Sequence, residues 1–119
     1  MEEDSKTFHS SWTLAEQLIF EIAGYLKTGR NYWLRGELEK YYWEFEAVVR
    51  VLWGILDEDE KITAKKKEDE IIKNLPINIQ NIQKKNVIAG LLKDYDGIVM
   101  TFIHKHKLDM PPKRDTTNL

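Results

Sequence analysis

The sequence predicts an all-α protein, an antiparallel bundle of about four helices. Apolar side chains recur at steps of three and four residues along most of the chain, which is the period of an amphipathic helix. No run sustains the period-two alternation of a strand, and no turn dipeptide separates two strand-like runs. Short polar segments lie between the helical stretches, so successive helices should pack antiparallel. The length of 119 residues fits a single domain.

The first helix is expected over residues 13–28. Thr13-Leu-Ala-Glu16 has the form of a capping box, in which each of the two side chains accepts a hydrogen bond from the backbone N–H of the other residue. Apolar residues follow at helical spacing, and Gly29 then stands where a helix commonly ends. The acidic and polar residues 1–12 are expected to form a flexible segment.

The second helix is expected over residues 31–57 and has the strongest periodic signal in the chain. Its core stripe alternates steps of four and three over three heptads. The stripe consists of Leu34, Leu38, Tyr41, Phe45, Val48, Leu52 and Ile55. The charged run 57–61 is expected to form the turn that ends this helix.

The third and fourth helices are expected over residues 63–75 and 79–106. Oppositely charged pairs four residues apart support the third helix, and Pro76 should close it. The fourth helix has a long apolar face that includes Leu92, Tyr95 and Phe102. Residues 108–119 have the composition of a disordered tail, so the domain should span residues 13–107.

The outer side of the second helix carries a large aromatic ring among small residues. Trp43 points away from the core stripe, and the face around it consists of Gly36, Trp43, Ala47, Arg50 and Gly54. Because glycine inside a helix costs up to about 1 kcal/mol relative to alanine, two glycines on one face suggest that another helix approaches closely. Trp and Arg are also typical interface anchors.

Three interpretations of Trp43 stay open on the sequence. The first helix or the N-terminal segment, through Phe8 or Trp12, could cover it within the monomer. It could instead lie in a homodimer or partner interface, or it could stack on nucleic-acid bases. Nearby glutamates argue against base stacking, because stacking platforms normally have basic residues around the ring.

Charge is distributed unevenly between the two halves of the chain. Residues 1–60 carry a net charge of −7 and residues 61–119 a net charge of +5, for a total of −2. The lysine-rich stretches are residues 61–85 and 105–114. If they converge, they would bind a polyanion without sequence preference, and the candidate residues are Lys65, Lys66, Lys67, Lys84 and Lys85.

The sequence argues against most catalytic and metal chemistry. There is no cysteine, which excludes disulfides and thiolate ligands, and His104 and His106 diverge when they lie two apart on a helix. Glu39, Glu44 and Glu46 of the second helix have basic partners four residues away, and the glutamates of this helix should form a solvated surface. No phosphate-binding loop is present. We therefore expect no enzyme activity, no cofactor, no metal site and no small-molecule substrate.

The sequence favours a non-catalytic assembly or adaptor protein. We expect it to act through a homodimer or a protein partner at the Trp43 face, with a small nucleic-acid-binding subunit as the alternative. No stretch approaches the roughly 20 apolar residues of a membrane span, and no secretory signal is recognisable, so a cytoplasmic location is expected. The composition would fit a viral or a thermophile source.

Overall fold

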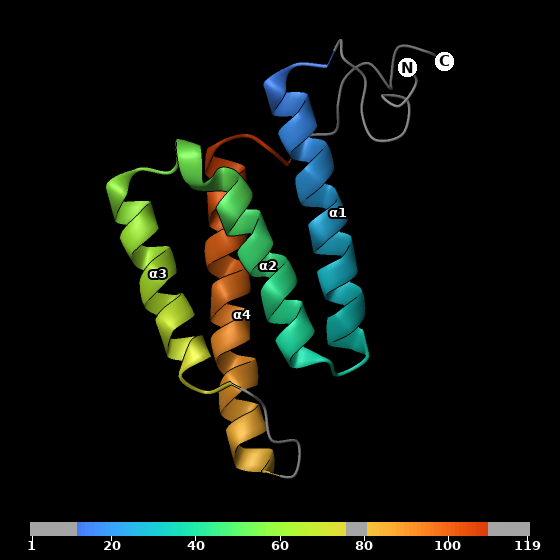
Figure 1. The fold of residues 1–119 in the computed structure, drawn as a ribbon, viewed down its shortest axis with the longest axis vertical. Coiled ribbons are helices and arrows are strands. Elements are labelled where there is room, and N and C mark those ends of the chain that lie inside the picture. The colour runs from blue at the N-terminus through green and yellow to red at the C-terminus, as the bar shows by residue number, and fades with distance from the viewer. Residues whose placement is uncertain (1–11, 76–80, 110–119) are drawn as a thin grey trace.

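Within the part of the chain that the structure describes, the fold consists of four α-helices and one short 3₁₀ segment (Figure 1). This is a computed structural model that describes residues 12–75 and 81–109. The elements are α1 (Leu14–Leu34), α2 (Leu38–Leu52), the 3₁₀ segment η2 (Trp53–Ile55), α3 (Glu58–Ile72) and α4 (Ile82–Lys105). The predicted all-α bundle of four helices is confirmed, although several of the predicted helix ends are not.

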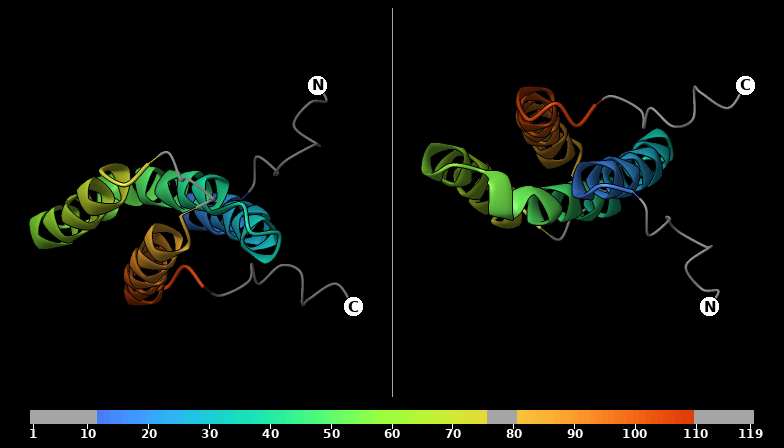
Figure 2. Two further views of the ribbon diagram at one scale, coloured as in Figure 1. Left: turned by 90° about the horizontal axis from the view of Figure 1, so that it is seen from below. Right: turned by 90° about the horizontal axis from the view of Figure 1, so that it is seen from above.

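The helices form a row of three with the fourth on one side. In the end views, α1, α2 and α3 lie side by side, and α4 lies against one face of this row (Figure 2). Helices that follow one another in the sequence run antiparallel, so α2 and α4 run in the same direction. α1 packs mainly on α2, α3 packs mainly on α4, and the α2–α4 seam joins these two pairs.

Helix α1 begins where the sequence predicts and ends six residues beyond the predicted end. The Thr13 capping box is present, with 3.1 Å from the backbone nitrogen of Glu16 to Thr13 Oγ1. Gly29 does not end the helix but is buried inside it. A Cβ atom at this position would lie 2.9 Å from Cε1 of Phe45, so glycine allows α1 and α2 to approach closely.

Gly36 is the residue that stops α1. It has a left-handed φ of 76°, which glycine adopts without strain. The N–H groups of Gly36 and Glu37 donate to the carbonyl oxygens of Trp33 and Tyr32, which is the Schellman pattern of a helix C-terminus. The second helix therefore begins at Leu38, seven residues after the predicted start, and it continues beyond Leu52 as η2.

Helix α3 begins in the run that was expected to be only a turn. Asp57 and Glu60 form a second capping box, with both backbone-to-carboxylate hydrogen bonds at 2.8 Å. The acidic side chains of the run 57–61 suit the first turn of a helix, where they oppose its positive end. The prediction of a start at residue 63 and an end at residue 75 was wrong, because α3 spans Glu58–Ile72.

The end of α4 is also capped. Lys107 takes a left-handed φ of 58°, and the N–H of Leu108 donates to the carbonyl oxygen of Ile103 at 2.9 Å. The side chain of Leu108 is buried in the core. The predicted tail thus begins too early at residue 108, and residues 110–119 lie outside the described residues, as do residues 1–11 of the predicted N-terminal segment.

The core lies mainly between α2 and its neighbours. Its largest buried side chains include Tyr42, Phe45, Leu52, Leu92 and Tyr95. Leu34, which the core stripe placed inside, is 81% exposed because α1 and not α2 contains it. No helix among the described residues is long and apolar enough to cross a membrane.

Candidate association surface

Trp43 lies on the side of α2 that faces away from the core. Its side chain is 45% exposed, although Tyr41, Tyr42 and Phe45 on the same helix are all buried. The indole ring rests against the ring of Tyr42, with 4.8 Å between their centroids. A large ring is therefore held in place by a buried neighbour while much of its surface faces solvent.

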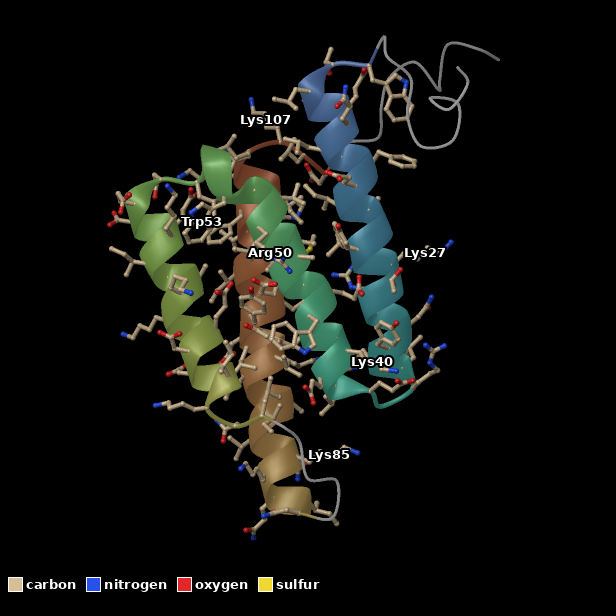
Figure 3. The ribbon with its side chains drawn as sticks, viewed as in Figure 1. Lys27, Lys40, Arg50, Trp53, Lys85 and Lys107 are labelled. Atoms are coloured by element: carbon tan, nitrogen blue, oxygen red, sulfur yellow. The ribbon has the colours of Figure 1, made fainter. Side chains whose placement is uncertain are left out.

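The Trp43 ring forms one wall of a cavity of about 410 Å³. The other walls include Gly36 from the α1–α2 connection, Leu38 from the first turn of α2 and Lys85 from α4. Figure 3 shows Lys85 projecting from the first turns of α4 toward the side on which α2 begins. The cavity thus combines three parts of the chain, and the sharp reversal at Gly36 places two of them together.

Charged side chains of both signs surround this cavity. Lys40 Nζ lies 3.0 Å from Glu37 Oε1, and Arg35 Nε lies 3.1 Å from Glu37 Oε2. The hydrogen bond from Lys40 lowers the pKa of Glu37 below its ordinary value, with a further contribution from Arg35. Glu39 and Lys85 complete the rim, so the surface presents an aromatic centre with a mixed polar border.

The other predicted interface residues continue along the same helix. Ala47 is partly exposed one turn after Trp43, and Arg50 is exposed with its guanidinium 2.7 Å from Glu46 Oε1. Gly54 lies in η2 and has open space around it. We call the surface formed by Gly36, Trp43, Ala47, Arg50 and Gly54 the Trp43 surface.

The two glycines of the Trp43 surface do not lie inside an α-helix. The sequence predicts them inside the second helix, where their cost would favour close helix packing. Gly36 lies in the turn before α2, where its positive φ requires glycine, and Gly54 lies in the 3₁₀ segment after it. Neither glycine is therefore evidence of a close approach, and the exposure of Trp43 is the stronger observation.

The residues expected to cover Trp43 lie elsewhere or are not described. Trp12 contacts Phe20 near the start of α1, with 5.6 Å between ring centroids, whereas Trp43 lies near the start of the antiparallel α2. Phe8 lies outside the described residues. Nothing described from α1 lines the cavity beside Trp43 except its C-terminal connection.

The lysines of the alternative nucleic-acid surface differ in their exposure and in their contacts. Lys67 is only 20% exposed at its side chain and pairs with Glu70 at 2.8 Å and with Asp94 at 3.6 Å. Lys65 Nζ lies 3.9 Å from Glu68, and Lys85 lies beside Trp43. Lys66 is exposed on α3, Lys84 is partly buried on α4, and Lys113 and Arg114 lie outside the described residues.

Polar contacts between α3 and α4 were missed by the sequence reasoning. Glu68 is 5% exposed and accepts a hydrogen bond of 2.6 Å from the hydroxyl of Tyr95. Glu60 is also buried, and its carboxylate lies 2.9 Å from Lys105 Nζ and 3.3 Å from His106 Nε2. The two glutamates are eight residues apart and lie on the same face of α3. Ala64 and Ile71 lie on this face too and are part of the core, so the spacing indicates that both glutamates point inward.

The pKa values of the two buried glutamates are shifted in opposite directions. Burial raises the pKa of Glu68, and the hydrogen bond from Tyr95 offsets only part of this effect. Burial also favours the neutral form of Glu60, but hydrogen bonds from the backbone of Asp57, from Lys105 and from His106 outweigh it and lower the pKa. In residues 12–75 and 81–109, no three Asp, Glu or His side chains gather as metal ligands.

Comparison of the chain with protein-family models, with curated proteins and with solved structures found no match.

Proposed function

We propose that the protein is a non-catalytic helical assembly protein that associates with a second copy of itself through the Trp43 surface. One observation carries this proposal: a tryptophan nearly half exposed, held against a buried tyrosine, lines a cavity large enough for a side chain of a partner. Tryptophan is among the residues most enriched at the energetic centre of interfaces.

The rim of the cavity supports self-association in particular. It carries Glu37 and Glu39 together with Lys40 and Lys85, so two copies related by a two-fold axis can place opposite charges across the contact. Nucleic acid fits this surface less well, because the glutamates would repel phosphates. The ion pairs of Lys67 also reduce the positive charge that α3 offers to a polyanion.

The test is the solution mass of the wild type and of Trp43→Glu, measured by light scattering at high concentration. The wild type should exceed the monomer mass of 14.1 kDa, and Trp43→Glu should be smaller while keeping its helical circular dichroism. Trp53→Glu is the matched control, because Trp53 is 36% exposed and lies beyond the other end of α2 (Figure 3). Its ring contacts Lys61, with Nζ 5.5 Å from the ring centroid. This variant should keep the wild-type mass.

A wild type that stays at 14.1 kDa at high concentration would overturn the proposal, as would a Trp43→Glu variant of unchanged mass. If Trp43→Glu unfolds, Ala47→Lys takes its place, since Ala47 lies one turn further along the same surface and is partly exposed.

A further inference from the structure

A second exposed apolar region lies between α1 and α4, and it shares no lining residue with the cavity beside Trp43. It is a groove of about 550 Å³. Its walls include Ile19, Ala23 and Leu26 from α1 and Met100 and Ile103 from α4. Ala23 is exposed, and Ile19, Leu26 and Met100 are each only partly buried, so the residues that the structure describes leave these apolar side chains incompletely covered.

The groove follows from the arrangement of the helices. α4 packs on α2 and α3, and α1 packs on α2, so α1 and α4 flank a space without packing tightly on one another (Figure 2). Polar contacts join them toward the end of α1, where Arg30 lies 3.4 Å from Asp96 and 3.6 Å from the sulfur of Met100. Lys93 Nζ of α4 also lies 6.0 Å from the centroid of the Trp33 ring. The other helices of the chain reach neither wall of the groove.

The shape and polarity of the groove call for a helix with a narrow apolar stripe. Helix α1 has such a stripe on the flank that lines the groove, because Ile19, Ala23 and Leu26 follow at steps of four and three. The small side chain of Ala23 stands at its centre, where two helices could cross closely. With 21 residues, α1 is about 31 Å long.

The charges of α1 specify the direction in which a second α1 would lie. Its first half carries Glu16 and Glu21 and no basic residue, and its second half carries Lys27 and Arg30 and no acidic residue. Glu16 and Arg30 are each seven residues from Ala23. In an antiparallel pair centred on Ala23, the acidic half of each helix meets the basic half of the other, whereas a parallel pair would oppose like charges.

We propose that the α1–α4 groove receives α1 of a second copy of the chain, antiparallel and related by a two-fold axis near Ala23. Each α1 then lies between α1 and α4 of the other copy. Ile19 packs against the aliphatic part of Lys27 of the second copy, and Glu16 lies near Arg30 of the second copy. Arg30 can turn toward this partner because its side chain is 48% exposed and its contact with Asp96 is long.

This contact is separate from the one at Trp43, and the two together have a structural consequence. If a chain has two different self-complementary surfaces, each copy can bind one neighbour through the first surface and another neighbour through the second. Such contacts build assemblies larger than a dimer. Both surfaces can be tested independently, because a substitution in one leaves the other unchanged.

The experiment measures solution mass by light scattering in the Trp43→Glu background, so that only the α1 contact remains. This variant should have about twice the monomer mass of 14.1 kDa. Adding Ala23→Lys should halve the mass, because a charge is placed at the centre of the crossing. Adding Thr28→Lys is the matched control: Thr28 is exposed on α1 but outside the lining of the groove, so the mass should not change.

A charge exchange tests the antiparallel direction. Glu16→Arg alone and Arg30→Glu alone should each lower the mass toward 14.1 kDa, and an equimolar mixture of the two should recover dimers made of one chain of each kind. Because Glu16→Arg also removes the capping contact with Thr13, its helical circular dichroism must match that of the parent variant. A monomeric Trp43→Glu variant, or an Ala23→Lys variant with undiminished mass, would overturn the proposal. Failure of the mixture to form mixed dimers would also overturn it.

Discussion

The α1–α2 pair and the α3–α4 pair are both antiparallel helix pairs, but they are held together by different forces. The α1–α2 contact is close and largely apolar, with Gly29 of α1 against the ring of Phe45. The α3–α4 contact depends on ion pairs and hydrogen bonds from Glu60, Lys67 and Glu68. Two of the four buried residues of α3 are glutamates, as the set Glu60, Ala64, Glu68 and Ile71 shows.

This difference shows that a helix with few apolar side chains can still pack into a protein core. Buried charges are costly unless they are paired and hydrogen-bonded, and Glu60 and Glu68 each have a partner on α4. The stability of the α1–α2 pair should therefore depend mainly on side-chain volume. That of the α3–α4 pair should depend on pH.

Gly29→Ala should cause the largest loss among the changes considered. The new methyl group would lie 2.9 Å from a carbon of the Phe45 ring and 3.1 Å from Cβ of Glu44, so the ring or the helices must shift to make room. Overpacking of this kind costs about 1–3 kcal/mol in the free energy of unfolding, measured by urea denaturation. Gly24→Ala on the same helix is the control: it meets open space and should raise stability by up to about 1 kcal/mol. Equal effects at both positions would show that the close approach is not needed.

Glu60→Gln should lower the free energy of unfolding by about 1–2 kcal/mol at neutral pH, because it removes charge-assisted hydrogen bonds to Lys105 and His106. The pKa of Glu60 is lowered in the folded state, so its contribution is present above the unfolded pKa and is lost as the pH falls through the folded pKa. Denaturation curves of both proteins should thus converge in acid. A difference that persists unchanged in acid would contradict this account.

Glu68→Gln should have the smallest effect and the opposite sign. The amide oxygen can still accept from Tyr95, and the variant carries no buried charge. Because burial raises the pKa of Glu68, its favourable contribution is complete below the unfolded pKa and is lost as the pH rises through the folded pKa. At neutral pH the variant should match the wild type or exceed it by less than about 1 kcal/mol. A large loss of stability at neutral pH, with none in acid, would show that the ionised carboxylate is required.

Much of the fold could be predicted from periodicity and capping, because these signals are local. The Thr13 capping box and the buried stripe from Leu38 to Leu52 appear as expected. The roles of Gly29 and Gly36 were exchanged in the prediction, since only the position of Phe45 explains why glycine is needed inside α1. Local sequence does not contain that contact.

The candidate surface was predictable in part for the same reason. The helical angle of Trp43 places it outside the core, and its exposure agrees. The proximity of Lys85 could not be derived, because it depends on how α4 lies across α2. The capping box of Asp57 and Glu60 is present in the sequence, but the prediction of a turn over residues 57–61 missed it. The inward position of Glu60 was missed for the same reason.

The polar contacts of α3 also settle its register against α4. Small or sparse apolar residues such as Ala64 and Ile71 would fit α4 in more than one position. A slip of one helical turn, about 5.4 Å, would part Glu60 from Lys105 and His106 and would part Glu68 from Tyr95 at the same time. We infer that the two carboxylates, which lie at different positions along α3, select a single register of α3 against α4. Apolar packing alone would permit several registers.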